Sequence, residues 1–426
     1  GDVRMKREDN IYQIYVQILK EELVTAMGCT EPIAISYAAA KARAVLGELP
    51  EKIVVKASGS IIKNVKSVVV PNTGGLRGIE AAAAAGVVCG NENKKLEVLS
   101  EIESEDIERI KGYLGQADIK VEYQETGRTF DLSVCVYKEH SQASVRITDY
   151  HTNIVQIEKN WELIRDDLKD EKIEKANRDV LSMENIWEFV RCADIEDVKE
   201  TLDKQIECNM KIAREGIRGN YGANIGSILL KMEGDSVQVR AKAMAAAGSD
   251  ARMNGCGLPV VINSGSGNQG ITCSVPILVY GESLNCDIEK IYRALLLSNL
   301  TAIYIKAGIG TLSAYCGAVS AGAAAGAGIA YLHGGGYEEI KHTVVNALAI
   351  VSGIVCDGAK ASCAAKIASS VEAGIVGYYM YLNEQEFCAG EGIVAEGIDR
   401  TIENIGILGK EGMKETNKKI IEMMIK

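Results

Sequence analysis

The chain has 426 residues, of which 47% are hydrophobic and 25% charged, and its formal net charge is −11. This composition excludes a disordered chain, and the negative charge argues against a nucleic-acid-binding surface. Residues 1–8 are charged and lack the apolar core of a signal peptide, which predicts a cytoplasmic protein. In that compartment the twelve cysteines are expected to be thiols or metal ligands rather than disulfides.

The first part of the chain, residues 1–94, is predicted to be mainly helical. Apolar residues recur at helical spacing from Ile11 to Met27, and Thr30 can cap a second helix that follows directly. Cys29 therefore lies at a helix start, where the pKa of a thiol tends to fall and the thiolate becomes available as a base or nucleophile. The alternative is a structural role as a small residue at a tight helix–helix corner.

A polar glycine loop, PNTGGLRG at residues 71–78, leads into an alanine-rich helix. Such a loop can present backbone amides and an arginine to a carboxylate. Its glycines can equally serve the geometry of a tight turn, so the loop alone does not indicate a site.

Residues 95–160 differ in pattern. A helix near Ser104 to Leu114 is followed by alternating runs at 132–137, 143–148 and 154–157, which predict an antiparallel meander. We therefore expect an α+β fold with a mainly α-helical catalytic body and a small α/β subdomain that carries an antiparallel sheet. The expected divisions are residues 1–94 for the N-terminal part of the body, 95–160 for the subdomain and 161–426 for a large helical domain.

From Trp161 onward the pattern is helical nearly to the end, beginning with a helix expected over Trp161 to Leu168. A break at GCGLPVVINSGSGNQG offers amides, hydroxyls and a carboxamide that suit the carboxylate of an amino acid. The uncharged stretch from Ala307 to Leu332 is long enough to span a bilayer. It is mostly Gly, Ala and Ser, which drive membrane insertion poorly, so it predicts a buried central helix.

Three cysteines in the last third of the chain stand at intervals of 40 and 7, at Cys316, Cys356 and Cys363. Each has small neighbours, which let the backbone approach an inorganic centre and donate amides to its sulfurs. Three thiolates without an obvious fourth indicate an iron–sulfur cluster with one open iron. The alternative is three buried cysteines that act as small hydrophobic residues.

The interval of 7 sets a structural condition. Seven residues of helix rise about 10.5 Å, too far for two cysteines to hold one compact cluster comfortably. Residues 356–358 should therefore form a turn, with Cys363 in the first turns of the helix that follows. The free amides and positive end of that helix would then face an anionic cluster.

Five motifs together carry a resemblance to a known family: GCTEP at 28–32, PNTGG at 71–75, NSGSGNQG at 263–270, AYCGA at 314–318 and VCDGAKASC at 355–363. They resemble the L-cysteine desulfidase family, which is related to the α-chain of iron–sulfur L-serine dehydratases and includes UPF0597-type proteins. The similarity covers nearly the whole chain. GCTEP favours the desulfidase branch.

The resemblance implies a lyase that converts L-cysteine to sulfide, ammonia and pyruvate by α,β-elimination without pyridoxal phosphate (PLP). It implies that Cys316, Cys356 and Cys363 hold a [4Fe–4S] cluster that acts as a Lewis acid, and that Cys29 as a thiolate removes the Cα proton. From chemistry alone, we expect the substrate-binding residues to be Thr30, Asn72, Thr73, Ser266 and Asn268.

Other functions stay open at this point. L-Serine dehydration by the same mechanism differs only in the leaving group. A PLP-dependent β-eliminase would use the Ser266 to Gln269 loop and Gly334 to Gly336, but no lysine precedes either loop convincingly. A cluster-based amino-acid sensor would not need Cys29. The expected partner is a small amino acid, with no nucleic acid and no membrane, and a homodimer is left open.

Overall fold

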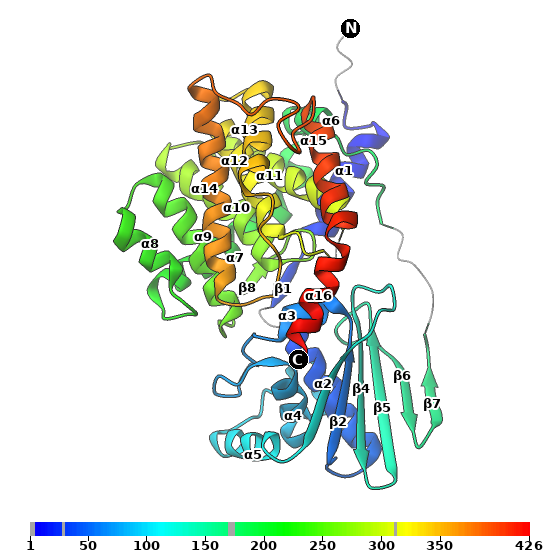
Figure 1. Ribbon diagram of the computed structural model, residues 1–426. Helices are drawn as coiled ribbons and strands as arrows, with labels where there is room; N and C mark the ends of the chain where they lie inside the picture. Colours follow the sequence, from blue (N-terminus) through cyan, green and yellow to red (C-terminus); the bar gives the residue numbers. More distant parts are fainter. Residues whose placement is uncertain (1–4, 28–29, 169–174, 311–312) are drawn as a thin grey trace.

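The protein has two lobes in the computed structural model, which describes residues 5–27, 30–168, 175–310 and 313–426. Figure 1 shows a helical body and, beneath it, a smaller lobe of sheet and helices. Each lobe has its own hydrophobic core. The expected α+β class, with a mainly helical body and a small α/β part, is confirmed.

The helical body is built around a helix of small residues, α12 (Gly317–Leu332), which is almost fully buried. Its neighbours are α10 (Gly267–Ser283), α11 (Ile288–Ile309), α13 (Tyr337–Val351) and α14 (Ser362–Leu382). Outer elements of the body are α1 (Asn10–Glu22), α6 (Met183–Cys192), α7 (Lys199–Arg218), α8 (Ile225–Glu233), α9 (Val237–Met253) and α15 (Ile398–Ile407). Among the described residues, no helix has the length and apolar character needed to cross a membrane.

The predicted central helix is present, but its expected start at Ala307 is wrong. Ala307 belongs to the last turn of α11, and Gly310 caps that helix with a φ of +87°. α12 begins only at Gly317. A positive φ is accessible to glycine without steric cost, so Gly310 ends the helix where the apolar pattern alone continues.

Glycines set the spacing of α12 and α14. A Cβ added at Gly322 would lie 2.4 Å from the backbone of Ser370, and one added at Gly326 would lie 2.7 Å from the backbone of Gly374. Side chains larger than hydrogen at these contacts would push the helices apart. Because the order of the contacts is the same along both helices, α12 and α14 run parallel, with their N-termini at one end.

The small lobe carries a mixed sheet with the order β3-β2-β4-β5-β6-β7. Its strands are β2 (Lys52–Ala57), β3 (Asp118–Tyr123), β4 (Asp131–Lys138), β5 (Ser141–Thr148), β6 (Ile154–Lys159) and β7 (Glu162–Asp166). β2 and β3 are parallel and all other neighbours are antiparallel, so the expected meander is confirmed. α2 (Thr30–Leu46) packs on β4 and β5, and α4 (Gly78–Cys89) packs on α2 and α5 (Ser104–Leu114).

Two features of this lobe differ from the sequence-based expectation. The helix expected over Trp161 to Leu168 is wrong, because Glu162–Asp166 pairs with β6 as an exposed edge strand. In addition, β2 lies between β3 and β4, so the sheet and its core draw on residues on both sides of position 94. We therefore propose residues 30–166 as the small lobe.

Three short or terminal elements connect the lobes. β1 (Thr25–Met27), which precedes α2, pairs with β8 (Pro259–Val261) of the body. α3 (Gly59–Val65) of the small lobe packs against the C-terminal helix α16 (Lys414–Met424), which lies at the junction in Figure 1. These contacts fix the small lobe against the loops that precede α10, α12 and α14.

The close contact of α12 and α14 makes a prediction about stability. Gly374→Ala should lower the free energy of unfolding by about 1–3 kcal/mol, because its Cβ would lie 2.4 Å from the Gly322 carbonyl oxygen. The measurement is chemical denaturation followed by circular dichroism. Gly112→Ala is the matched control: that glycine is exposed within α5 with nothing within 4 Å of the added Cβ, so it should gain about 1 kcal/mol. Equal effects of the two substitutions would contradict the packing argument.

Candidate active site

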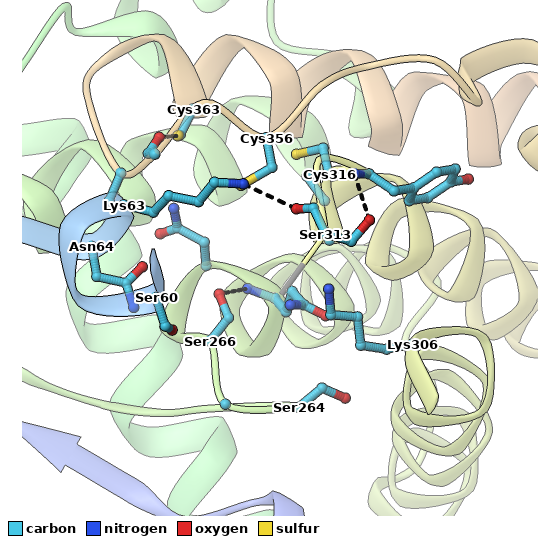
Figure 2. Close-up of a pocket in the computed structure, with 18 of the residues that line it drawn as sticks. Ser60, Lys63, Asn64, Ser264, Ser266, Lys306, Ser313, Cys316, Cys356 and Cys363 are labelled. Atoms are coloured by element: carbon cyan, nitrogen blue, oxygen red, sulfur yellow. Dashed lines mark hydrogen bonds between the residues drawn. The ribbon is translucent and has the colours of Figure 1, made fainter. Parts of the chain in front are cut away.

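A cavity of about 140 Å³ lies where the two lobes meet. It is lined by residues from the N-terminal ends of α10, α12 and α14, and by Ser60, Lys63 and Asn64 of α3. In Figure 2, three cysteines lie along the upper side of the cavity and Ser264, Ser266 and Lys306 lie along the lower side. Helix N-termini carry free amides and a partial positive charge, so this cavity suits an anion.

The fold brings together cysteines that are 40 and 7 residues apart in sequence. Tyr315 and Val355 form an antiparallel bridge, in which the Cys316 amide donates to the Ile354 carbonyl (3.1 Å) and the Cys356 amide donates to the Ala314 carbonyl (2.6 Å). This bridge holds the segment before α12 against the segment before α14.

The expected turn at residues 356–358 is confirmed. Gly358 has a φ of +98°, and α14 begins at Ser362, which puts Cys363 in its first turn. The Cys363 thiol donates to the Gly358 carbonyl at 3.2 Å. All three cysteines therefore line one cavity, and every cysteine among the described residues is a free thiol.

Burial raises the pKa of two of these thiols. Cys316 is 8% exposed, and burial, helped by the neighbouring Cys356 and Cys363, raises the pKa of its thiol to about 11. Burial also raises the pKa of the Cys363 thiol. A thiolate at these positions therefore needs a compensating positive charge, from a metal or from nearby cations.

Two lysines supply positive charge beside the thiols. Lys63 is 5% exposed and Lys306 is 9% exposed, and both line the cavity. Burial lowers the pKa of each amine, while the sulfurs of Cys316 and Cys356 act in the opposite direction. Thiolates and ammonium groups in this cavity thus stabilise each other's charged forms.

Lys63 also joins three separate parts of the chain. Its Nζ donates to the Ser313 carbonyl at 3.1 Å and to the side-chain oxygen of Asn417 on α16. Its own carbonyl accepts a hydrogen bond of 2.7 Å from the Ala359 amide, in the cysteine turn. The small lobe, the C-terminal helix and the loops of the cysteines are therefore linked through one residue.

The cysteine turn is further fixed by Asp357. Burial alone would raise the pKa of this carboxyl, but hydrogen bonds from Lys360 and Lys366 outweigh it and hold the pKa below its usual value. Lys366 also donates to the Val355 carbonyl at 2.8 Å. Asp357 thus stays ionised and ties the turn to the first part of α14.

The loop before α10 contributes the opposite wall. The Ser266 hydroxyl caps α10 by accepting from the Gln269 amide (3.3 Å). The Asn268 side chain accepts from Arg252 (3.4 Å) and donates to the sulfur of Met253. Both polar groups therefore already have partners within the protein.

The structure brings together only part of the predicted site. Cys316, Cys356, Cys363, Ser266 and Asn268 line the same cavity.

Three other predicted residues, all within the described part of the chain, are not part of this lining. Asn72 donates to the Leu99 carbonyl (3.2 Å), and the buried Thr73 hydroxyl donates to the Val70 carbonyl (2.7 Å), so both stabilise their own loop. Thr30 begins α2 and is not among the lining residues either. Cys29 lies outside the described residues, between β1 and α2.

Sequence reasoning missed Lys63, Lys306 and Gln269. Lys306 stands in a run that is otherwise apolar, and a lysine on the buried face of a helix was a usable signal. Lys63 gave no comparable signal, since its partners are distant in sequence.

The donor set suits an iron–sulfur centre. Cysteine thiolates are the usual ligands of such clusters, and three cysteines line this cavity beside helix N-termini and lysines. Among the described residues, no three Cys, His, Asp or Glu side chains meet the spacing for a single metal ion.

Comparison with known proteins identifies relatives along the whole chain. Residues 93–422 match the profile of a family described as "Serine dehydratase alpha chain". A UPF0597 protein of Desulfitobacterium hafniense is 59% identical over 99% of this chain and 98% of the relative. UPF0597 proteins of Lachnoclostridium phytofermentans and Treponema denticola are 52% and 42% identical, over 97% and 99% of this chain and all of each relative.

The contacts of Lys63 lead to a prediction about the C-terminal helix. Lys63→Met removes the hydrogen bonds to Ser313 and Asn417, so amides of α16 should exchange about tenfold to a hundredfold faster in hydrogen–deuterium exchange. Lys66→Met is the matched control, because Lys66 lies just after α3 and pairs with Glu80 instead. Unchanged exchange in Lys63→Met, or equal acceleration in Lys66→Met, would contradict the linking role.

Proposed function

The chain belongs to the serine dehydratase alpha-chain family, together with UPF0597 proteins, and we propose that it catalyses α,β-elimination on a small amino acid. The proposed substrate is L-cysteine, and with one water it yields sulfide, ammonia and pyruvate. The observation that carries this proposal is one cavity that combines three cysteines, two buried lysines and the N-terminal ends of three helices.

The proposed cofactor is a [4Fe–4S] cluster held by Cys316, Cys356 and Cys363. When bound, such a cluster supplies an iron without a protein thiolate, which can act as a Lewis acid on the leaving group. Burial raises the pKa of the Cys316 and Cys363 thiols, and metal binding would release the protons of the ligating thiols. Lys63 and Lys306 would offset part of the resulting negative charge.

Elimination also needs a base for the Cα proton. We propose the Cys29 thiolate for this role, since the residue immediately precedes α2, and a helix start favours the charged form of a thiol. Removal of the Cα proton forms the Cα–Cβ double bond as the Cβ–S bond breaks and the electron pair leaves with sulfur. The resulting aminoacrylate takes up a proton to give an imine, which water hydrolyses to pyruvate and ammonia.

The protein's contribution is to stabilise negative charge in a small cavity. The cavity of about 140 Å³ limits the number of water molecules around the reacting atoms. In that environment, lysines and helix amides stabilise a developing carbanion more strongly than they would in bulk water.

L-Serine is a second candidate substrate. The description of the matching family, "Serine dehydratase alpha chain", favours it, and the chemistry differs only in the loss of hydroxide instead of sulfide. Parallel assays with both amino acids decide between them. On the present proposal, kcat/KM should be at least tenfold higher for L-cysteine, and the reverse order would make serine dehydration the function.

The cysteine roles predict distinct losses. In protein reconstituted anaerobically with iron and sulfide, Cys356→Ala should lose both iron and pyruvate release. Cys29→Ala should keep its iron but lose roughly 10²–10⁴-fold in kcat, the typical contribution of a general base. The measurements are iron content and the release of pyruvate and sulfide.

Cys388→Ala serves as the matched control for both variants, because Cys388 is exposed and does not line the cavity. It should retain iron and activity. Turnover by cluster-free protein, or a requirement for PLP, would refute the cluster mechanism. Loss of iron from Cys29→Ala would refute the separate role of that residue.

A further inference from the structure

Gln269 and Lys306 both line the cavity and each has a polar side-chain atom without a partner among the described residues. Gln269 is 5% exposed, and its side-chain oxygen is buried without a hydrogen bond. Lys306 is 9% exposed, and its Nζ has no hydrogen bond or ion pair to any described residue. Buried polar atoms are nearly always paired, so the unpaired oxygen of Gln269, on the same cavity as the Lys306 amine, points to a ligand.

The Gln269 oxygen and the Lys306 amine need opposite kinds of hydrogen-bond partner. An amide oxygen accepts hydrogen bonds, and a lysine ammonium only donates them. An α-amino acid in its zwitterionic form carries one group for each: an ammonium that donates and a carboxylate that accepts. A ligand that has only a carboxylate or only an ammonium would satisfy one of the two residues and leave the other unpaired.

We propose that Lys306 binds the α-carboxylate and Gln269 accepts a hydrogen bond from the α-ammonium of the substrate, so that together they select zwitterionic amino acids. This subsite rests on the proposed function and deepens it.

The position of Gln269 supports a role beside the reacting atoms. Its side-chain amide lies against the backbone of Gly317, where an added Cβ would come within 2.4 Å of Nε2 and 2.5 Å of Cδ. Gly317 directly follows Cys316. The substrate ammonium would therefore lie next to one of the three cysteines, while Lys306 lies on the side that Figure 2 shows opposite them.

Three other polar residues of the cavity already have partners within the protein. Ser266 caps α10, and Asn268 contacts Arg252 and Met253. Lys63 is held by Ser313 and Asn417. Using any of these for the substrate would break an existing contact, whereas Lys306 and Gln269 would each gain one.

A carboxylate bound at Lys306 would also offset the cost of burying this amine in its charged form. Burial lowers the pKa of this amine, because an ammonium without a partner is poorly solvated there. Binding of a carboxylate restores the charged form, so substrate binding and lysine protonation support each other.

The test is binding of ligands that cannot react, measured by calorimetry on anaerobically reconstituted protein. L-Alanine has both charged groups and no leaving group, propionate lacks the ammonium, and ethylamine lacks the carboxylate. Wild type should bind L-alanine more tightly than either of the others.

Each variant should remove one half of this preference. Lys306→Met should weaken the binding of L-alanine about tenfold to a hundredfold, so that L-alanine binds no more tightly than ethylamine. L-Alanine should still bind more tightly than propionate to this variant. In Gln269→Met, L-alanine should bind no more tightly than propionate but still more tightly than ethylamine. Lys410→Met and Gln238→Met, the same substitutions at residues that line other cavities, should bind as wild type does.

Thermal unfolding of each variant shows whether it is folded, and the two variants test the subsite independently. The subsite is refuted if both variants bind L-alanine with wild-type affinity, or if each variant loses affinity equally for all three ligands. Pyruvate release from L-cysteine would in that case still support the proposed function. If wild type neither binds L-alanine nor releases pyruvate, the proposed function fails, and the subsite fails with it.

Discussion

The close approach of α12 and α14 is the constraint on which the rest of the site depends. Gly322 and Gly326 meet Ser370 and Gly374 at distances that leave no space for a Cβ. The helices are parallel, and following them back to their N-termini brings Cys316 level with the first turn of α14, which carries Cys363. The bridge between Tyr315 and Val355 then adds Cys356. Packing of small residues thus determines where the thiols meet.

A cavity built in this way concentrates charge. Helix N-termini and buried lysines attract anions, and positive charge nearby favours the thiolate forms of Cys316 and Cys363, whose pKa values burial raises. Each feature alone lowers the free energy of unfolding, since burying a lysine or an unpaired polar group is unfavourable. On the proposed function, a metal centre and an amino acid would bring the missing charges and make these features favourable together. A site that is incomplete without its ligands is expected of an enzyme rather than of a structural core.

Local patterns predicted much of this fold. The alternation of β4, β5 and β6, the turn at Gly358 and the start of α14 before Cys363 were all readable, because each depends on neighbouring residues. The edge strand β7 was mistaken for a helix, since its pairing with β6 decides its structure. Lys63 was missed because its partners Ser313 and Asn417 lie 250 and 354 residues away. Asn72 and Thr73 have the right chemistry for a carboxylate, but their hydrogen bonds serve their own loop.

The central claim is that three cysteines of this cavity hold a cluster whose remaining iron meets the substrate. The most direct measurement is the Mössbauer spectrum of protein reconstituted anaerobically with isotopically enriched iron, recorded with and without L-cysteine. The account predicts a [4Fe–4S] signal in which one iron alone changes when the amino acid is added. Two results would contradict this account: a protein that forms no cluster, or a cluster in which the signal of none of the four irons changes when L-cysteine is added.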